Sequence, residues 1–168
     1  MGPLRTMNKV AYRCPTPADA SAVWRLVAES GTLDANSAYC YMVLFRHFAD
    51  TCQVAEHDGR LIGFVTAYIP PTDADALFVW QIAVAPEARG QGIGAALLRS
   101  LLELPAACGV SWLMATISPG NAPSRRLFES LARERGAVCE LAEGGFPAEW
   151  FPEPGHEAEP LIRIRLKR

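Results

Sequence analysis

The sequence has little of what marks an exported, membrane-bound or nucleic-acid-binding protein. Residues 1–9 are too short and too polar a stretch to contain the apolar segment of a signal peptide. No apolar run approaches the length of a membrane span, and no basic run suggests a membrane surface or a nucleic acid. The net charge is only −2. These absences predict a cytoplasmic globular protein with no nucleic acid and no membrane among its partners.

The cysteines form no recognisable pattern. They are odd in number, scattered along the chain and without a Cys-x-x-Cys pair, which argues against a disulfide framework and against a cysteine-rich metal site. Reduced thiols, most of them small buried hydrophobic side chains, are favoured instead, and we expect no metal. The cysteines are Cys14, Cys40, Cys52, Cys108 and Cys139.

The composition and periodicity that are present indicate one α+β (α/β) domain. With 168 residues, half of them apolar and a fifth charged, the chain can bury a sizeable core. We expect a disordered leader over residues 1–8 and a single domain over 9–168. The apolar patterns predict a mixed, twisted sheet of six to seven strands flanked by about four helices. Strands are expected at 10–13, 52–56, 61–68, 77–84, 112–117, 138–141 and 161–166, and helices at 17–30, 37–48, 92–104 and 121–135.

The most informative stretch is residues 79–98, which reads as a buried strand, a proline-marked turn, a glycine-rich loop and the start of an amphipathic helix. A helix N-terminus has unpaired N–H groups and partial positive charge, which suits a phosphate. The loop glycines let the backbone approach a ligand without an intervening Cβ. The Gly-x-Gly-x-x-Gly spacing of a dinucleotide loop is absent, and no lysine lies nearby to complete a Walker loop. A glycine-rich connector without a ligand is the remaining alternative.

Arg89-x-x-Gly92-x-Gly94, after a strand that ends in hydrophobic-Ala-Val, resembles the acyl-CoA pyrophosphate loop of the GNAT N-acetyltransferases. Asn121 alone indicates a helix cap, but in register with this loop it resembles the GNAT asparagine that also contacts pantetheine. The resemblance implies the GNAT fold with splayed central strands, acetyl-CoA as cosubstrate, and backbone groups of residues 82–84 that stabilise an oxyanion beside a bulge. The cofactor-binding residues expected on this basis are Ile82, Ala83, Val84, Arg89, Gly90, Gln91, Gly92, Ile93, Gly94, Ala95 and Asn121.

Four further segments are similar to a narrower family, the L-2,4-diaminobutyrate acetyltransferases of ectoine biosynthesis. They are residues 33–41, 77–81, 115–117 and 156–159, and the resemblance extends over nearly the whole chain. It implies acetyl transfer from acetyl-CoA to the γ-amino group of L-2,4-diaminobutyrate. The product would be cyclised by a separate synthase to ectoine, a compatible solute that serves osmoprotection. The resemblance also implies a cytosolic homodimer whose substrate is a small-molecule amine.

Acetyl transfer to an amine requires acidic groups, because an alkyl amine is mostly protonated at neutral pH and must lose a proton before it attacks. GNAT folds place the loop after the first helix and the segment before the last strand beside the acceptor pocket, so the resemblance implies Asp34 and Glu159 as catalytic residues. Which carboxylate is the base, and whether a water relays the proton, stays open. The substrate-binding residues expected are Asp34, Tyr39, Trp80, His156, Glu157 and Glu159.

Each of these residues also has a structural interpretation. Asp34 is typical of a turn, residues 156–159 of a solvated acidic loop, and a strand tryptophan of a core. In the family interpretation Trp80 walls the pocket and meets the ammonium group by cation–π attraction. Tyr39 and Tyr41 lie on different faces of the same expected helix, so only one of them is expected in the site. The resemblance to the diaminobutyrate acetyltransferases favours Tyr39.

Phe128 stands where many GNAT enzymes have the tyrosine that protonates the departing sulfur. Because a thiol has a pKa near 8.5, the thiolate is a tolerable leaving group, and we expect no single side chain to act as acid. Tyr41, a cysteine or a water are the alternatives. Arg125 and Arg126 are expected on a solvated helix face.

Two other functions remain open from the sequence. One is a GNAT enzyme that acetylates another amine, including a protein, which would need an open peptide groove. The other is a non-catalytic acyl-CoA-binding module, against which the glycine loop and the acidic residues argue.

Overall fold

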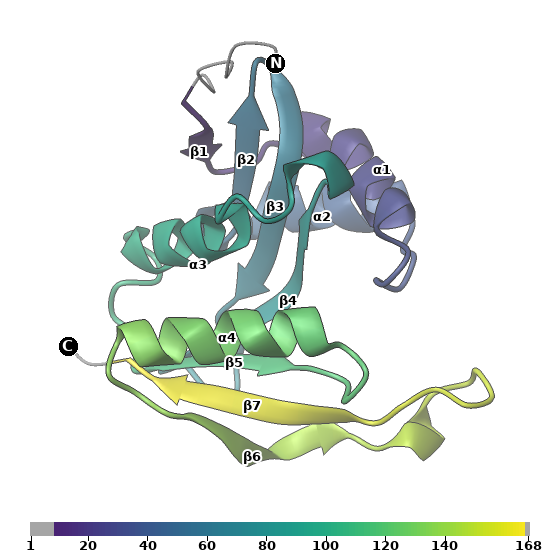
Figure 1. Cartoon of the computed structure of the whole chain (residues 1–168), viewed down its shortest axis with the longest axis vertical. Coiled ribbons are helices and arrows are strands. Elements are labelled where there is room, and N and C mark those ends of the chain that lie inside the picture. Colours follow the sequence, from purple (N-terminus) through teal and green to yellow (C-terminus); the bar gives the residue numbers. More distant parts are fainter. Residues whose placement is uncertain (1–8, 167–168) are drawn as a thin grey trace, which may run out of the picture.

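The computed structural model describes residues 9–166. The leader expected over residues 1–8 lies outside this part of the chain. The strands are β1 (Ala11–Arg13), β2 (Gln53–His57), β3 (Arg60–Tyr68), β4 (Ala76–Val84), β5 (Trp112–Thr116), β6 (Cys139–Phe146) and β7 (Glu159–Arg165). They form one sheet in the order β1-β2-β3-β4-β5-β7-β6 (Figure 1). Only β4 and β5 are parallel among these neighbours, which confirms the predicted mixed sheet.

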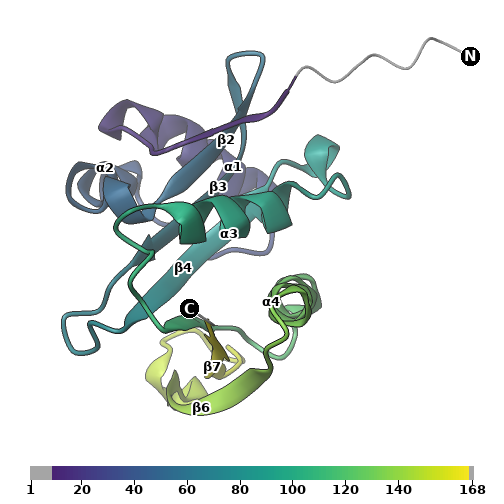
Figure 2. The same cartoon turned by 90° about the vertical axis from the view of Figure 1, so that its left-hand side faces the viewer.

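Helices cover both faces of this sheet. They are α1 (Ala20–Ser30), α2 (Ala38–His47), α3 (Ile93–Glu103) and α4 (Ala122–Glu134), with short 3-10 turns at Pro17–Asp19, Ala49–Thr51, Pro86–Ala88 and Ala148–Trp150. Figure 2 shows α1 and α2 against one face of the N-terminal strands and α3 against the other. No helix within residues 9–166 is both long and apolar enough to cross a membrane.

The core lies where the apolar stripes of the helices meet the sheet. Val23 of α1, Leu97 and Leu101 of α3, and Leu77 of β4 are all fully buried. Apolar residues spaced three or four apart within a helix lie on one side, so each helix has an apolar face toward the strands and a polar face toward water. The helices therefore cover β3 and β4 from both sides.

The central strands separate halfway along their length. β4 pairs with β5 only from Ala76 to Val79, opposite residues 112–115. At Trp80 the register of β4 against β3 shifts, because Thr66 pairs with Gln81 and Ala67 with Val79. This bulge leaves Trp80 without a partner opposite and turns the rest of β4 away from β5. The predicted splay is therefore present, with its bulge just before residues 82–84.

The last hairpin differs from the prediction. The sequence predicts a strand over 138–141 followed by a loop, but β6 continues to Phe146 after an irregularity between Ala142 and Phe146. Gly144 has φ 105°, and a Cβ on Gly145 would lie 2.7 Å from the carbonyl oxygen of Glu159. Glycines therefore let β6 approach β7 closely where an alternating pattern is lacking. As a result β7 begins at Glu159 rather than at the expected residue 161.

Candidate active site

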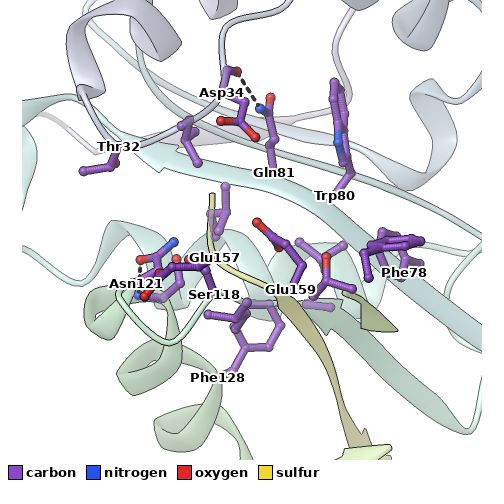
Figure 3. A pocket seen from close by; sticks show the side chains of 18 of the residues that line it. Thr32, Asp34, Phe78, Trp80, Gln81, Ser118, Asn121, Phe128, Glu157 and Glu159 are labelled. Carbon is purple, nitrogen blue, oxygen red and sulfur yellow. Dashed lines mark hydrogen bonds between the residues drawn. The ribbon is translucent and has the colours of Figure 1, made fainter. Parts of the chain in front are cut away.

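A cavity of about 520 Å³ opens where β4 and β5 part (Figure 3). We call it the larger cavity. Its walls come from the α1–α2 loop, the bulged part of β4, the end of β5, the start of α4 and the segment before β7. It is lined by Thr32, Leu33, Asp34, Asn36, Tyr68, Phe78, Val79, Trp80, Gln81, Ile82, Ala115, Thr116, Ile117, Ser118, Asn121, Ser124, Phe128, Phe146, Phe151, His156, Glu157 and Glu159.

Glu159 is the half-buried carboxylate of this cavity. Burial is the main cause that raises its pKa above the ordinary value of a glutamate, and the nearby charges of Asp34 and Glu157 act in the same direction. A hydrogen bond with Thr116 and the proximity of His156 oppose that rise. A carboxylate whose pKa is raised toward neutrality is a better proton acceptor from an ammonium group than an ordinary glutamate.

His156 has a defined orientation beside these acids. Its ring stacks on Phe151 with centroids 3.8 Å apart and planes 10° apart. Nδ1 lies 2.6 Å from the carbonyl oxygen of Glu157, and because a carbonyl only accepts, Nδ1 carries the proton. Nε2 lies 3.9 Å from Oδ2 of Asp34, so these two side chains face one another.

Asp34 and Glu157 differ in what their carboxylates contact. The Asp34 side chain is 79% exposed at the mouth of the cavity. Oε2 of Glu157 accepts a hydrogen bond of 2.9 Å from the backbone N–H of Gly120. Glu157 thus joins the segment before β7 to the loop before α4, a contact that the sequence did not indicate. A Cβ at Gly120 would lie 2.7 Å from that oxygen, so any other residue there would make the Glu157 side chain shift.

The structure does not bring Tyr39 to the larger cavity. Tyr39 is 72% exposed on α2, whereas Tyr41 is fully buried against the sheet with its ring 5.9 Å from that of Trp80. Two residues two positions apart on a helix differ by about 200° in direction, so only one of them faces the sheet. Trp80 does line the cavity, at the bulge of β4.

Gln81 belongs to a segment that matches the family, but the sequence alone assigned it no role. It is 6% exposed, lines the larger cavity and hydrogen-bonds both Tyr41 and the backbone of Asp34. A polar residue inside the almost continuous apolar run of residues 77–84 was the signal that could have found it.

A smaller cavity of about 240 Å³ adjoins the larger one, with Thr32, Leu33, Ile82, Asn121 and Ser124 lining both. Of the expected cofactor residues, those that line the smaller cavity are Ile82, Ala83, Val84, Arg89, Gly94 and Asn121. The remaining ones, Gly90, Gln91, Gly92, Ile93 and Ala95, form the adjoining turn and the first residues of α3.

The glycine loop ends in an accessible helix N-terminus. Gly90 and Gly92 have φ of 75° and 78°, a left-handed conformation that favours glycine. The backbone N–H of Ala96 bonds to the carbonyl of Gly92, so the three preceding N–H groups have no place in the helix ladder. The side chain of Ile93 is buried, and only its backbone can meet a ligand. This arrangement suits the phosphates of an acyl-CoA.

Asn121 caps α4, since its Oδ1 accepts a hydrogen bond of 3.3 Å from the N–H of Ser124. Phe128 of the same helix is 2% exposed and offers only carbon to the larger cavity. The hydroxyl of Tyr41 donates to Oε1 of Gln81 at 2.6 Å, and no cysteine lines either cavity within residues 9–166. Nor do the described residues contain a cluster of His, Cys, Asp and Glu placed for a metal ion.

Comparison with known proteins agrees with this geometry. The model of the acetyltransferase (GNAT) family matches residues 20–132. L-2,4-diaminobutyric acid acetyltransferase of Halalkalibacterium halodurans is 45% identical over 150 residues, which cover 89% of this chain and 78% of that protein. The enzyme of the same name from Bordetella parapertussis is 46% identical over 154 residues, covering 90% and 82%.

Solved structures give the same result. Diaminobutyrate acetyltransferase EctA from Paenibacillus lautus, in complex with L-2,4-diaminobutyric acid and coenzyme A, superimposes with a TM-score of 0.89 at 44% identity, over 94% of this chain and 95% of that one. Ard1 from Thermoplasma volcanium, at 16% identity, has a TM-score of 0.76 over 95% and 99% of the chains and shows the fold alone. With its splayed β4, its glycine loop and these relatives, the chain belongs to the GNAT family of acetyltransferases.

Proposed function

We propose that this protein transfers the acetyl group of acetyl-CoA to the γ-amino group of L-2,4-diaminobutyrate, giving N-γ-acetyl-diaminobutyrate. The observation that carries the proposal is the pair of adjoining cavities, one acidic and one at a helix N-terminus beside a glycine loop. Relatives that are 44–46% identical over most of their length are named for the same acceptor, L-2,4-diaminobutyrate.

The reaction is a direct attack on the thioester. The acceptor amine enters as an ammonium ion, and the carboxylates of Asp34 and Glu159 attract it into the larger cavity. Glu159, with its raised pKa, takes the proton and leaves the neutral amine as nucleophile. Backbone N–H groups of the bulged β4 stabilise the oxyanion that forms on the acetyl carbon. The C–N bond forms, the C–S bond breaks, and the thiolate leaves without a dedicated side-chain acid. The nitrogen then releases its second proton, which the thiolate or solvent water takes up.

The shape of the acceptor side supports a small amine rather than a protein. The segment between β6 and β7 places Phe151 and His156 in the wall of the larger cavity, opposite the α1–α2 loop. A peptide substrate would need this end to be open. Acetylation of a protein is therefore the second candidate.

We also propose that the protein acts as a cytoplasmic homodimer in ectoine synthesis, and so in osmoprotection. The support for a dimer is an exposed apolar stripe on α2, where Tyr39, Met42 and Val43 are 72%, 40% and 38% exposed. Their spacing puts them on one side of the helix, a face that a second copy would cover. Light scattering after gel filtration measures the mass directly; a monomer at micromolar concentration would contradict the proposal.

Thiol release from acetyl-CoA tests the reaction, with L-2,4-diaminobutyrate, ornithine, lysine and a peptide amine as acceptors. We expect strong preference for diaminobutyrate, with the acetyl group on the γ-nitrogen by NMR. Preference for ornithine or a peptide would discard this substrate and keep the family. Binding of coenzyme A without turnover of any amine would indicate a non-catalytic module.

A further inference from the structure

One polar side chain of β4 connects the sheet to the loop that carries Asp34. Oε1 of Gln81 accepts a hydrogen bond of 2.6 Å from the hydroxyl of Tyr41. Its Nε2 donates one of 3.3 Å to the backbone carbonyl of Asp34 (Figure 3). Because a backbone carbonyl only accepts, a single orientation of the amide satisfies both bonds. Gln81 is therefore held at both ends of its side-chain amide.

The backbone of Gln81 is also held, at the point where the bulge interrupts the ladder. Its N–H donates to Oγ1 of Thr66 at 3.1 Å, and the same hydroxyl donates to the carbonyl of Gln81 at 3.3 Å. Thr66 is fully buried, so solvent water cannot replace Gln81 as the hydrogen-bond partner of this hydroxyl. Thr66 thus keeps Gln81 in place beside the unpaired Trp80.

Tyr41 holds the amide from the other side. Its ring is fully buried, with its centroid 5.9 Å from that of Trp80 and 6.3 Å from that of Phe64. Burial raises the pKa of Tyr41, so its hydroxyl keeps its proton and stays a donor at neutral pH. Tyr41 therefore packs against one wall of the larger cavity while it orients the amide of Gln81.

Asp34 depends on its backbone for its position. Its carboxylate is 79% exposed and faces the ring of His156 at 3.9 Å, a distance too long for a hydrogen bond. The α1–α2 loop around it has no regular secondary structure. Asn36 donates to the same carbonyl at 3.2 Å from within that loop, whereas Gln81 supplies a link to the rigid sheet.

We propose that Gln81, supported by Tyr41, is a positioning residue for the acceptor amine: it sets where the carboxylate of Asp34 lies over the cavity without touching the reacting atoms. This inference rests on the proposed function, in which Asp34 attracts the ammonium group. Loss of the amide weakens acceptor binding and leaves acetyl-CoA binding intact, because the amide bonds Tyr41 and the α1–α2 loop and does not line the smaller cavity.

A double-mutant cycle tests this role, with Gln81→Met, Asp34→Asn and the double variant compared by steady-state kinetics. Gln81→Met is expected to raise the KM for diaminobutyrate about tenfold, the size of one lost hydrogen bond. The KM for acetyl-CoA should change by no more than about twofold. The double variant should equal Asp34→Asn alone, because both changes act through one carboxylate.

Gln53→Met is the matched control. Gln53 of β2 is 2% exposed and bonds Ser100 and Cys14, away from both cavities. It should lower Tm as Gln81→Met does and leave the KM for diaminobutyrate unchanged. If Gln81→Met does not fold, Tyr41→Phe removes one hydroxyl, keeps the ring, and should raise the same KM by a smaller factor.

Two results would overturn the positioning role: additive effects in the double variant, or equal rises in the KM of both substrates. The wild-type rate separates this inference from the function on which it rests. Failure of the wild-type protein to acetylate diaminobutyrate removes both, whereas normal wild-type turnover with additive variants removes the positioning role alone.

Discussion

The two cavities of the site are built from different kinds of chemical group. We call the smaller cavity, with the glycine loop, the cofactor half and the larger cavity the acceptor half. The cofactor half relies on backbone groups of two neighbouring segments, the end of β4 that has parted from β5 and the start of α3, with Asn121 and Ser124 beside them. The acceptor half uses side chains from the α1–α2 loop, β4, β5 and the segment before β7. Backbone groups survive most substitutions and side chains do not. Side-chain changes should therefore damage the acceptor half more than the cofactor half.

The largest effect is expected for Glu159→Gln. Removing the proposed general base should lower kcat by about 10²–10⁴, and activity of the wild-type protein should rise with pH through the raised pKa of Glu159. Glu140→Gln is the control, since Glu140 is an exposed partner of Arg163 on the neighbouring strand. A fall in kcat of less than about threefold would remove Glu159 from the role of base.

The same Glu159→Gln change that lowers kcat should not lower the stability of the protein. The raised pKa means that the folded protein favours protonated Glu159, so its ionised form costs stability at neutral pH. Glu159→Gln should hold or slightly raise Tm near pH 7, and this advantage should vanish below about pH 4, where the unfolded carboxyl is also protonated. Tm against pH for both proteins measures it.

Asp34→Asn should come second. Loss of one charge-assisted hydrogen bond predicts a fall in kcat/KM for diaminobutyrate of about ten- to a hundredfold. Tm should hardly move, because the carboxylate is 79% exposed. Asp50→Asn, at another exposed aspartate, is the control. Equal losses of stability and activity would make Asp34 a structural residue.

Gly94→Ala tests whether the cofactor half can be damaged at all. Its Cβ would lie 3.4 Å from Leu127, an ordinary contact, and would project at the smaller cavity. Alanine inside a helix should add about 0.5–1 kcal/mol to the free energy of unfolding. We expect a several-fold rise in the KM for acetyl-CoA and none in that for diaminobutyrate. An equal rise in both would erase the distinction between the halves.

The smallest effect is expected for Ile82→Val. Ile82 lines both cavities, but its backbone supplies the polar groups. Shortening the side chain by one methyl should cost about 1 kcal/mol of stability or less and leave kcat/KM for acetyl-CoA within about twofold. A tenfold loss would show that side chains matter in the cofactor half as well.

How far the sequence predicts each half follows the same division. The strand, glycine loop and helix of residues 79–98 are local features, so the apolar period and the turn residues are enough to predict them. Asp34, Trp80 and Glu159 are found only through resemblance, because nothing local places residues so far apart in one cavity.

Contacts that depend on tertiary packing are beyond the sequence. The structure has Tyr39 exposed on α2 and Tyr41 buried against the sheet, and a helix wheel does not say which face meets the sheet. Glu157 contacts Gly120 only because two loops far apart in the sequence meet in the fold. The strand β6 continues through glycines, which interrupt the alternation of apolar and polar residues that would predict a strand. Gln81 has its role only once the bulge at Trp80 has set its direction.

The separation of β4 from β5 has a consequence for the protein without its cosubstrate. On the side that faces β5, residues 80–84 have no neighbouring strand and form an unpaired strand edge inside the sheet. Proteins normally cover or shorten such edges where they occur at the outside of a sheet. An extended ligand can lie along this edge and hydrogen-bond to its backbone as an added strand would. Such a ligand at a hundred times its dissociation constant stabilises the fold by about 2.7 kcal/mol. Acetyl-CoA bound along β4 is therefore expected to raise the free energy of unfolding of the protein as well as to serve as its cosubstrate.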